Sequence, residues 1–186
     1  MISRIFIFLI SILLFGCISQ QKPSALNGGV LLTIKTKSNQ ENNSNSKILF
    51  FQKSSETEVI TIEDFQLKNK FKIEFEKRGF IFDNKLTTNS LIVSLNKNRM
   101  SFPINLDSGR SLISNGVGYH ISIYKSKDKN AVEIFNGTAT ILSIKANIES
   151  LYESKLIESL VLKYGSQDFS ITKWIDDVKT VDEIIK

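Results

Sequence analysis

The spacing of apolar side chains along the chain limits the folds open to it more than any other feature. In residues 61–78 and 147–164, large apolar residues recur every four positions, which is typical of a helix that buries one face. Other segments alternate apolar with polar residues, or run apolar with many β-branched and aromatic residues, as strands do. We expect strands in residues 30–36, 47–52, 80–82, 90–96, 119–125 and 131–144. This mixture predicts an α+β fold: a two-layer sandwich in which two main helices cover one face of a mostly antiparallel sheet of five or six strands.

Both predicted helices carry signals at their ends. Thr61 and Asp64 form a pattern that resembles a capping box, in which side chain and backbone bond each other reciprocally at the start of a helix. Gly79 and Gly165 follow the two helices, where glycine is favoured because it adopts the left-handed conformation without strain. In the second helix the apolar stripe is widened by Leu151, Ile157, Val161 and Tyr164. The predicted core comprises Phe71, Phe75, Leu91, Val93, Ile121, Ile123, Leu156 and Leu160.

The turns between strands predict how the strands pair. Residues 30–36 and 47–52 are joined by a polar, Asn-rich stretch and are expected to form a hairpin. Residues 119–144 give the strongest hairpin signal, and Gly137 within them predicts a bulge or the close approach of a neighbour. Between these, residues 98–118 contain Pro103 and several glycine turn signals, which predicts a long excursion with at most a short strand.

The C-terminal segment, residues 171–185, has apolar residues at helical spacing. We expect a third, acidic helix that packs Trp174 against the sheet. The alternative is a tail that binds a partner.

The N-terminus has the features of a secretory signal. Arg4 precedes an apolar run over residues 5–15, whose length suits a signal peptide and falls short of the ~20 residues of a membrane-spanning helix. The small residue Gly16 then stands directly before Cys17. The run Leu14-Phe15-Gly16-Cys17 resembles the lipobox of bacterial lipoproteins. An ordinary cleavable signal, or an uncleaved anchor with an incidental cysteine, is the alternative.

The lipobox resemblance implies an address and a modification for the chain. It implies that residues 1–16 are a signal peptide and that Cys17 carries diacylglycerol on its sulfur and a fatty acid such as palmitate on its amino group. Residues 17–29 then form the lipidated cysteine with a polar, flexible tether, and residues 30–186 form one domain. No Asp follows Cys17, so for a Gram-negative cell the resemblance favours the outer membrane. We expect the domain to face the periplasm, with the cell surface as the alternative.

The residue composition argues against several classes of function. The net charge of +5 is spread over intermixed lysines and acids, with few arginines, which gives no reason to expect nucleic-acid binding. One histidine and one cysteine make a zinc site improbable, and neither Asp107-Ser108-Gly109 nor Asp176-Asp177 has the spacing of a calcium loop. We therefore expect no metal or other cofactor.

The histidine is the residue that most resembles a catalytic group. His120 could act as a base, oriented by Asp107 or Asp128, yet no G-x-S-x-G elbow is present and His120 alternates with polar residues as an ordinary strand face does. We expect His120 to be a sheet-surface or interface residue and the protein not to be an enzyme.

A second resemblance covers residues 80–165. The motifs Lys77-Arg78-Gly79-Phe80, Ser90-Leu91-Ile92-Val93, Gly116-Val117-Gly118 and Ile134-Phe135-Asn136-Gly137-Thr138-Ala139 are similar, in that order, to a family of uncharacterised Gram-negative envelope lipoproteins with a domain of unknown function. The chain departs from the family at Asn89-Ser90 and at Phe135. The resemblance implies a small two-layer fold without a known enzymatic site.

Two functions remain after these exclusions. The first is a membrane-anchored envelope lipoprotein that acts as a non-enzymatic assembly or accessory factor and binds a protein partner. The second is a lipid- or glycan-binding module of the envelope, in which lysines and residues 98–118 would contact an anionic ligand.

Overall fold

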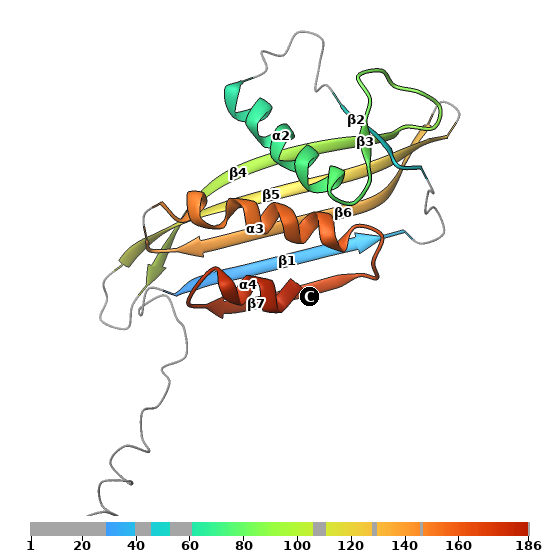
Figure 1. The fold of residues 1–186 in the computed structure, drawn as a ribbon. Coiled ribbons are helices and arrows are strands. Elements are labelled where there is room, and N and C mark those ends of the chain that lie inside the picture. The colour runs from blue at the N-terminus through green and yellow to red at the C-terminus, as the bar shows by residue number, and fades with distance from the viewer. Residues whose placement is uncertain are drawn as a thin grey trace, which may run out of the picture.

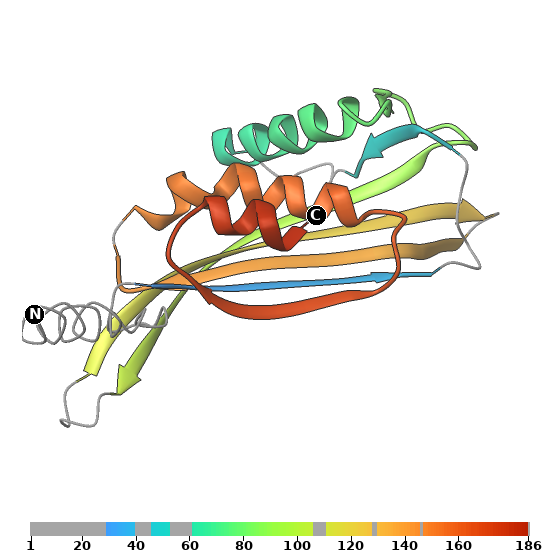
Figure 2. The same cartoon turned by 60° about the horizontal axis from the view of Figure 1, so that its bottom comes forward.

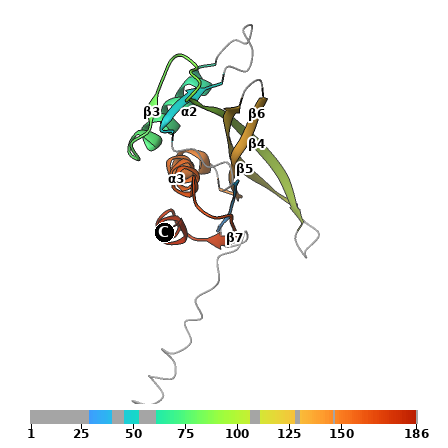
Figure 3. The ribbon, with the colours of Figure 1, turned by 90° about the vertical axis from the view of Figure 1, so that its right-hand side faces the viewer.

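The helices that the structure describes lie together on one face of a seven-stranded sheet, as the computed structural model shows (Figure 1). The structure describes residues 29–39, 46–52, 61–105, 111–127, 130–145 and 147–185. The strands are β1 (Val30–Ser38), β2 (Ile48–Phe51), β3 (Ile81–Phe82), β4 (Leu91–Asn105), β5 (Ser111–Lys127), β6 (Asn130–Ser143) and β7 (Phe169–Ile175). The helices are α2 (Ile62–Glu76), α3 (Ile148–Lys163) and α4 (Lys179–Ile185). Seen end-on, helices and sheet form two layers (Figure 3), which confirms the predicted α+β sandwich.

The sheet is mostly antiparallel, in the order β3-β2-β4-β5-β6-β1-β7. Its exception is β2, which runs parallel to both β3 and β4. Parallel neighbours need a crossover connection, and α2 provides it between β2 and β3. The predicted strand number of five or six falls short because the C-terminal segment adds a strand.

The helix α2 begins and ends where its sequence signals predicted. The Thr61 hydroxyl accepts from the Asp64 N–H at 3.0 Å, and the Asp64 carboxylate accepts from the Thr61 N–H at 3.1 Å, so the capping box is complete. Gly79 has a φ of +79°, the left-handed conformation that ends the helix and lets β3 begin two residues on.

The helix α3 lies across the middle of the sheet. Its predicted stripe is buried from Ile148 to Val161, and Gly165 takes the left-handed conformation just beyond the helix. One prediction is wrong: Leu151 does not widen the buried stripe but is 59% exposed. At 100° per residue, Leu151 lies outside the arc of α3 that the buried residues occupy, so it faces solvent.

The long excursion predicted for residues 98–118 does not exist in the described residues. Strands β4 and β5 instead pair without interruption from Leu91↔Lys125 to Asn105↔Ser111. Pro103 is accommodated because β2 pairs only with the first residues of β4, which leaves the rest of β4 an edge strand whose outward N–H groups need no partner.

The hairpin predicted over residues 119–144 is confirmed as β5–β6. Its bulge lies where the register shifts between Ile123 and Tyr124, not at Gly137. At Gly137 the alternative prediction, the close approach of a neighbour, is confirmed. A Cβ there would lie 3.0 Å from Leu160 of α3 and 3.1 Å from the Phe135 ring.

The predicted hairpin between residues 30–36 and 47–52 is wrong. Strand β1 is an interior strand that pairs with β6 on one side and β7 on the other. The pattern identified both strands, but nothing local to them encodes their partners, which lie roughly 30 to 150 residues away along the chain.

The C-terminal segment is also corrected. Trp174 lies in β7 and pairs opposite Leu31, so the first half of the expected third helix is a strand. Only α4 is helical, and its Val181 and Ile185 are buried against the domain.

The two faces of the sheet differ. The helix-covered face holds the core, which includes each of the eight residues predicted from the sequence, all at most 1% exposed. We call the opposite face, which carries none of the described helices, the open face (Figure 3).

Candidate functional site: a charged cluster between helices and sheet

Among the described residues, the densest group of ionisable side chains lies where α2 and α3 cross the far part of β4. We call it the ion cluster. It consists of Glu63 and Lys70 of α2, Lys97 and Arg99 of β4, and Glu149 and Glu153 of α3.

The alternation of β4 places the two central cations. Leu91, Val93 and Leu95 face the helices, and two further steps of the same alternation put Lys97 and Arg99 on that face. Both helices begin beside this part of β4. Glu63 and Glu149 lie in their first turns, where the helix dipole favours negative charge.

Lys97 is the centre of the cluster. Its side chain is only 11% exposed, and its Nζ pairs with Glu63 Oε1 at 2.7 Å, with Glu149, and with Glu153 Oε1 at 3.7 Å. Arg99 joins the same two first-turn carboxylates from outside, with Nε 3.0 Å from Glu149 Oε2 and Nη2 2.5 Å from Glu63 Oε1. Three elements are thereby tied together.

Glu153 links the cluster to the core. It accepts from the Tyr119 hydroxyl at 3.1 Å and pairs with Lys70 across the two helices. Burial of the ring, together with the nearby carboxylate, raises the pKa of Tyr119, so that its hydroxyl stays protonated and donates.

The pKa shifts in the cluster all favour the charged forms. Hydrogen bonds from Lys97 and Arg99 lower the pKa of Glu63 to about 2. Burial opposes charge at Glu149 and Lys97, yet their hydrogen bonds outweigh it: the pKa of Glu149 is lowered and that of Lys97 is raised.

These shifts are opposite to those that catalysis needs. A general acid at neutral pH requires a carboxyl with a raised pKa, and a nucleophilic lysine requires a lowered one. The cluster holds three carboxylates and three cations, so it also has no surplus charge for a ligand. A cavity of about 350 Å³ lies over it, lined by Ile62, Gln66 and Leu67 besides the charged groups. The arrangement fixes the helix starts on the sheet.

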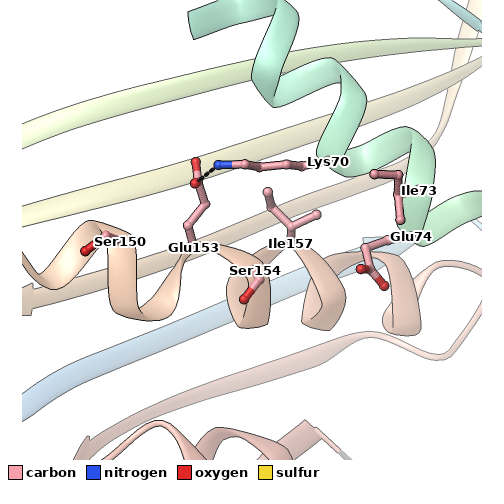
Figure 4. Close-up of a pocket in the computed structure, with 7 residues that line it drawn as sticks. All are labelled: Lys70, Ile73, Glu74, Ser150, Glu153, Ser154 and Ile157. Atoms are coloured by element: carbon pink, nitrogen blue, oxygen red, sulfur yellow. Dashed lines mark hydrogen bonds and ion pairs between the residues drawn. The ribbon is translucent and has the colours of Figure 1, made fainter.

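A second hollow separates the two main helices further along. It has a volume of about 220 Å³ (Figure 4). Lys70, Ile73 and Glu74 line it from α2, and Ser150, Glu153, Ser154 and Ile157 line it from α3. Lys70 reaches across to Glu153 at one end, while Ile73 and Ile157 make the middle apolar (Figure 4).

His120 lies on the open face, as expected of a sheet-surface residue. Its Nδ1 is 3.1 Å from the Thr138 hydroxyl and its Nε2 is 3.1 Å from the Ser122 hydroxyl. The Ser122 hydroxyl also accepts from the Asn136 amide at 3.2 Å. The proposed orienting acids Asp107 and Asp128 lie outside the described residues, so that part of the prediction is untested.

The other sequence-predicted sites are placed as follows. Cys17 lies outside the described residues. Asp177 accepts from the backbone N–H and the hydroxyl of Thr180, which ties down the start of α4. Among the described residues no group of three or more His, Cys, Asp or Glu side chains is arranged to hold a metal ion.

Sequence reasoning missed the ion cluster. The available signal is that Lys97 and Arg99 continue the alternation of β4, but the turn residues in 98–118 predict an irregular segment and so hide this signal.

No protein-family model matches the chain, and no curated protein matches it. Solved structures do resemble it. A PDZ domain protein from Parabacteroides distasonis aligns with a TM-score of 0.54 and 12% identity over 80% of this chain, which spans 40% of that protein's length. A minor lipoprotein from Acinetobacter baumannii aligns with a TM-score of 0.37 and 13% identity, covering 75% of this chain and 90% of the other. PelC from Paraburkholderia phytofirmans aligns with a TM-score of 0.42 and 11% identity, covering 70% and 94%.

At these identities the likeness concerns the fold alone, and the last two scores are too low to support an argument about function. Within the described residues, no helix has the length and apolar character needed to cross a membrane.

Proposed function

We propose that this protein is a lipid-anchored lipoprotein of the bacterial envelope that binds a protein partner and performs no catalysis. The anchor rests on the lipobox that ends at Cys17. The residues after Cys17 favour the outer membrane of a Gram-negative cell, and the proposal places the domain on its periplasmic side. The observation that carries partner binding is a second apolar stripe on α2, which faces solvent.

The stripe is separate from the buried face of the same helix. Ile62, Phe65 and Ile73 are 80%, 61% and 53% exposed, and at 100° per residue they lie within about 80° of one another around the helix. The buried residues Leu67 and Phe71 lie on the opposite side. Water-exposed apolar side chains gathered in this way mark interaction surfaces.

The neighbouring groove extends this surface. Ile73 belongs both to the stripe and to the hollow between α2 and α3 (Figure 4). The ion cluster beside it holds both helices in place, so the surface is preformed. A partner segment with apolar side chains at helical or strand spacing fits these features.

The absence of catalysis is part of the proposal. It is supported by the mutual pairing of the acids and cations of the ion cluster and by the engagement of both His120 ring nitrogens with hydroxyl groups.

The anchor is tested by mass spectrometry of the N-terminal peptide of the protein isolated from membranes. We expect Cys17 to be the first residue and to carry three acyl chains, and we expect Cys17→Ala to release the protein from the membrane fraction. An unmodified Cys17 would refute the anchor.

Partner binding is tested by placing a photo-crosslinking amino acid at Phe65 in living cells. We expect an adduct of one defined mass that is lost when Ile62 and Ile73 are both replaced by Ser, whereas a crosslinker at Thr172 on the open face should not form it. These positions are exposed, so the Ser variants should melt as the wild type does. Bound lipid or glycan without any adduct would favour the alternative, a lipid- or glycan-binding module.

A further inference from the structure

The β4–β5 hairpin extends beyond the rest of the sheet at one end. Strand β6 ends at Ser143, opposite Asn115 of β5. From Phe102↔Ser114 to Asn105↔Ser111, β4 and β5 therefore pair only with each other. We call residues 102–105 and 111–114 the ribbon, and Figure 2 shows it projecting past the helices.

The ribbon exposes apolar side chains. Ile113 is 67% exposed, Phe102 is 48% exposed, and Pro103 is exposed too. No charged residue occurs in the sequence from Met100 to Asn105 or from Ser111 to Asn115, whereas Asp107 and Arg110 stand between these two stretches. A two-stranded hairpin with such side chains is marginal in water, so the ribbon is suited to a surface that covers it.

The open face is apolar beside this ribbon, and at its far end it carries Phe50, Ile92 and Tyr124, which oppose one another across β2, β4 and β5. We call residues that lie directly opposite one another across neighbouring strands a row. The row next to the ribbon consists of Met100, Gly116, Leu142, Leu31 and Trp174, and the Met100 side chain lies over Gly116. The next row away from the ribbon is polar and consists of Asn98, Gly118, Thr140, Thr33 and Thr172. The open face thus changes from apolar to polar between one row and the next, about 7 Å along the strands.

The described chain begins at the same end of the sheet. The Gly29 carbonyl accepts from the Ser143 hydroxyl at 3.2 Å, and Leu31 lies in the apolar row itself. The C-terminal ends of α2 and α3 lie at the opposite end of β4, together with strand β3 and its Ile81 (Figure 1).

We propose that the ribbon rests in the interfacial layer of the bilayer to which Cys17 anchors the protein, with the apolar row at its boundary. This inference rests on the anchor of the proposed function. The stretch from Cys17 to Gly29 can span roughly 40 Å when extended, whereas the ribbon is about 13 Å long. The tether therefore lets the ribbon reach the surface, and its position at the entry point of the chain brings it there first.

A bilayer suits this end better than another occupant. Depths of about 5–10 Å are typical of interfacial segments, so most of the ribbon's length of about 13 Å would lie in that layer. The β4–β5 ladder pairs the backbone groups between its two strands, whereas those on its two outer edges keep water and headgroups as partners at interfacial depth. Trp174 at the boundary is the residue type that membrane interfaces favour.

The test uses the full acylated protein in vesicles of phosphatidylethanolamine and phosphatidylglycerol, with and without bromine on the upper acyl chain. In a Trp174→Phe background, a single tryptophan is placed at Phe102 or, as the matched control, at Ile81, which is 65% exposed at the opposite end. We expect brominated lipid to quench the tryptophan at 102 by roughly half and to leave the one at 81 unchanged.

Equal, negligible quenching at both positions would overturn the inference. Emission at 102 that is shifted to the blue in plain and brominated lipid alike, without quenching, would assign the ribbon to a second copy of the chain and overturn it as well. Ile113→Trp, at a 67% exposed position, repeats the measurement should the variant at 102 fail to fold.

Mass spectrometry of the same samples separates the two proposals. Acylated Cys17 with an unquenched tryptophan at 102 keeps the anchor and removes the ribbon contact, whereas an unacylated Cys17 removes both.

Discussion

Lys97 shows how one position in a strand can decide the arrangement of two helices. Its aliphatic stem continues the apolar row of β4, and its buried ammonium group needs carboxylates nearby. Glu63 and Glu149 supply them from the first turns of α2 and α3. A buried charge of this kind gives less net stability than its short distances suggest, but it disfavours other positions of the helices.

The pKa of Glu63 makes the cluster sensitive to acid. The carboxyl has a pKa of about 2 in the folded protein and 4.5 without these partners. Its contribution is therefore complete above about pH 5 and is lost as the pH falls toward 2. Because Glu63 is 45% exposed, solvent screening limits this contribution to about 1 kcal/mol. We predict that Glu63→Gln lowers the unfolding free energy by about that amount at pH 7 and leaves it near the wild-type value at pH 2, as urea unfolding would measure.

Glu76→Gln is the matched control on the same helix. Glu76 pairs only loosely with Lys72, at 3.7 Å, and both side chains are exposed, so its removal should change the unfolding curve little at either pH. An equal pH dependence in the wild type and Glu63→Gln would contradict the assignment.

At the scale of elements, β5 and β6 approach closely at the two glycines of β5. A Cβ on Gly116 would lie 2.7 Å from the Ile141 carbonyl oxygen and would also overlap the Leu142 side chain. At Gly118 the nearest atoms are the Met100 Cε at 3.1 Å and the Thr140 Oγ1 at 3.3 Å. A methionine end can move, whereas a ladder carbonyl cannot without disturbing the sheet.

The two glycines should therefore differ when each is replaced by alanine. We predict that Gly116→Ala lowers the unfolding free energy by about 1–3 kcal/mol, as overpacked sites do. Gly118→Ala should change it by less than about 0.5 kcal/mol, because the strain is small and alanine restricts the unfolded chain. Thermal unfolding of both variants checks the contrast, and equal losses would show that the approach at Gly116 is relieved elsewhere.

At the scale of the whole molecule, the C-terminal segment completes the domain. Strand β7 covers the edge of β1, and α4 returns to the helix layer (Figure 2). There Asp182 pairs with Lys155 of α3 at 2.7 Å. Val181 is fully buried, as expected of a structural element and not of a free tail.

Replacing Val181 tests this role. We predict that Val181→Ala lowers the unfolding free energy by about 2 kcal/mol, because it leaves a cavity under α4. Glu183→Ala, exposed on the same helix, should leave it within about 0.5 kcal/mol. Unchanged urea midpoints for both variants would favour the alternative of a partner-binding tail.

The parts of the fold that sequence predicted are those with local causes. The capping box at Thr61, the glycines after both helices and the alternation of Ile121 and Ile123 depend on residues at most four positions apart. Pro103 led to the wrong prediction of an excursion over residues 98–118, because a proline usually interrupts a strand. Only the sheet order shows that Pro103 occupies an unpaired edge. The single helix predicted over residues 171–185 was wrong because a few apolar residues at helical spacing, Trp174 among them, also fit a strand followed by a short helix.

The sequence by itself determined the two main helices, the eight predicted core residues and the α+β class, since burial of apolar faces and the bonding of helix ends are set by neighbours along the chain. Tertiary structure alone decided that β1 lies between β6 and β7, that β2 runs parallel to β4, and that Lys97 meets Glu63 and Glu149. These contacts join segments from about thirty to more than a hundred residues apart. Their energy depends on which surfaces meet, and a local pattern carries no record of that.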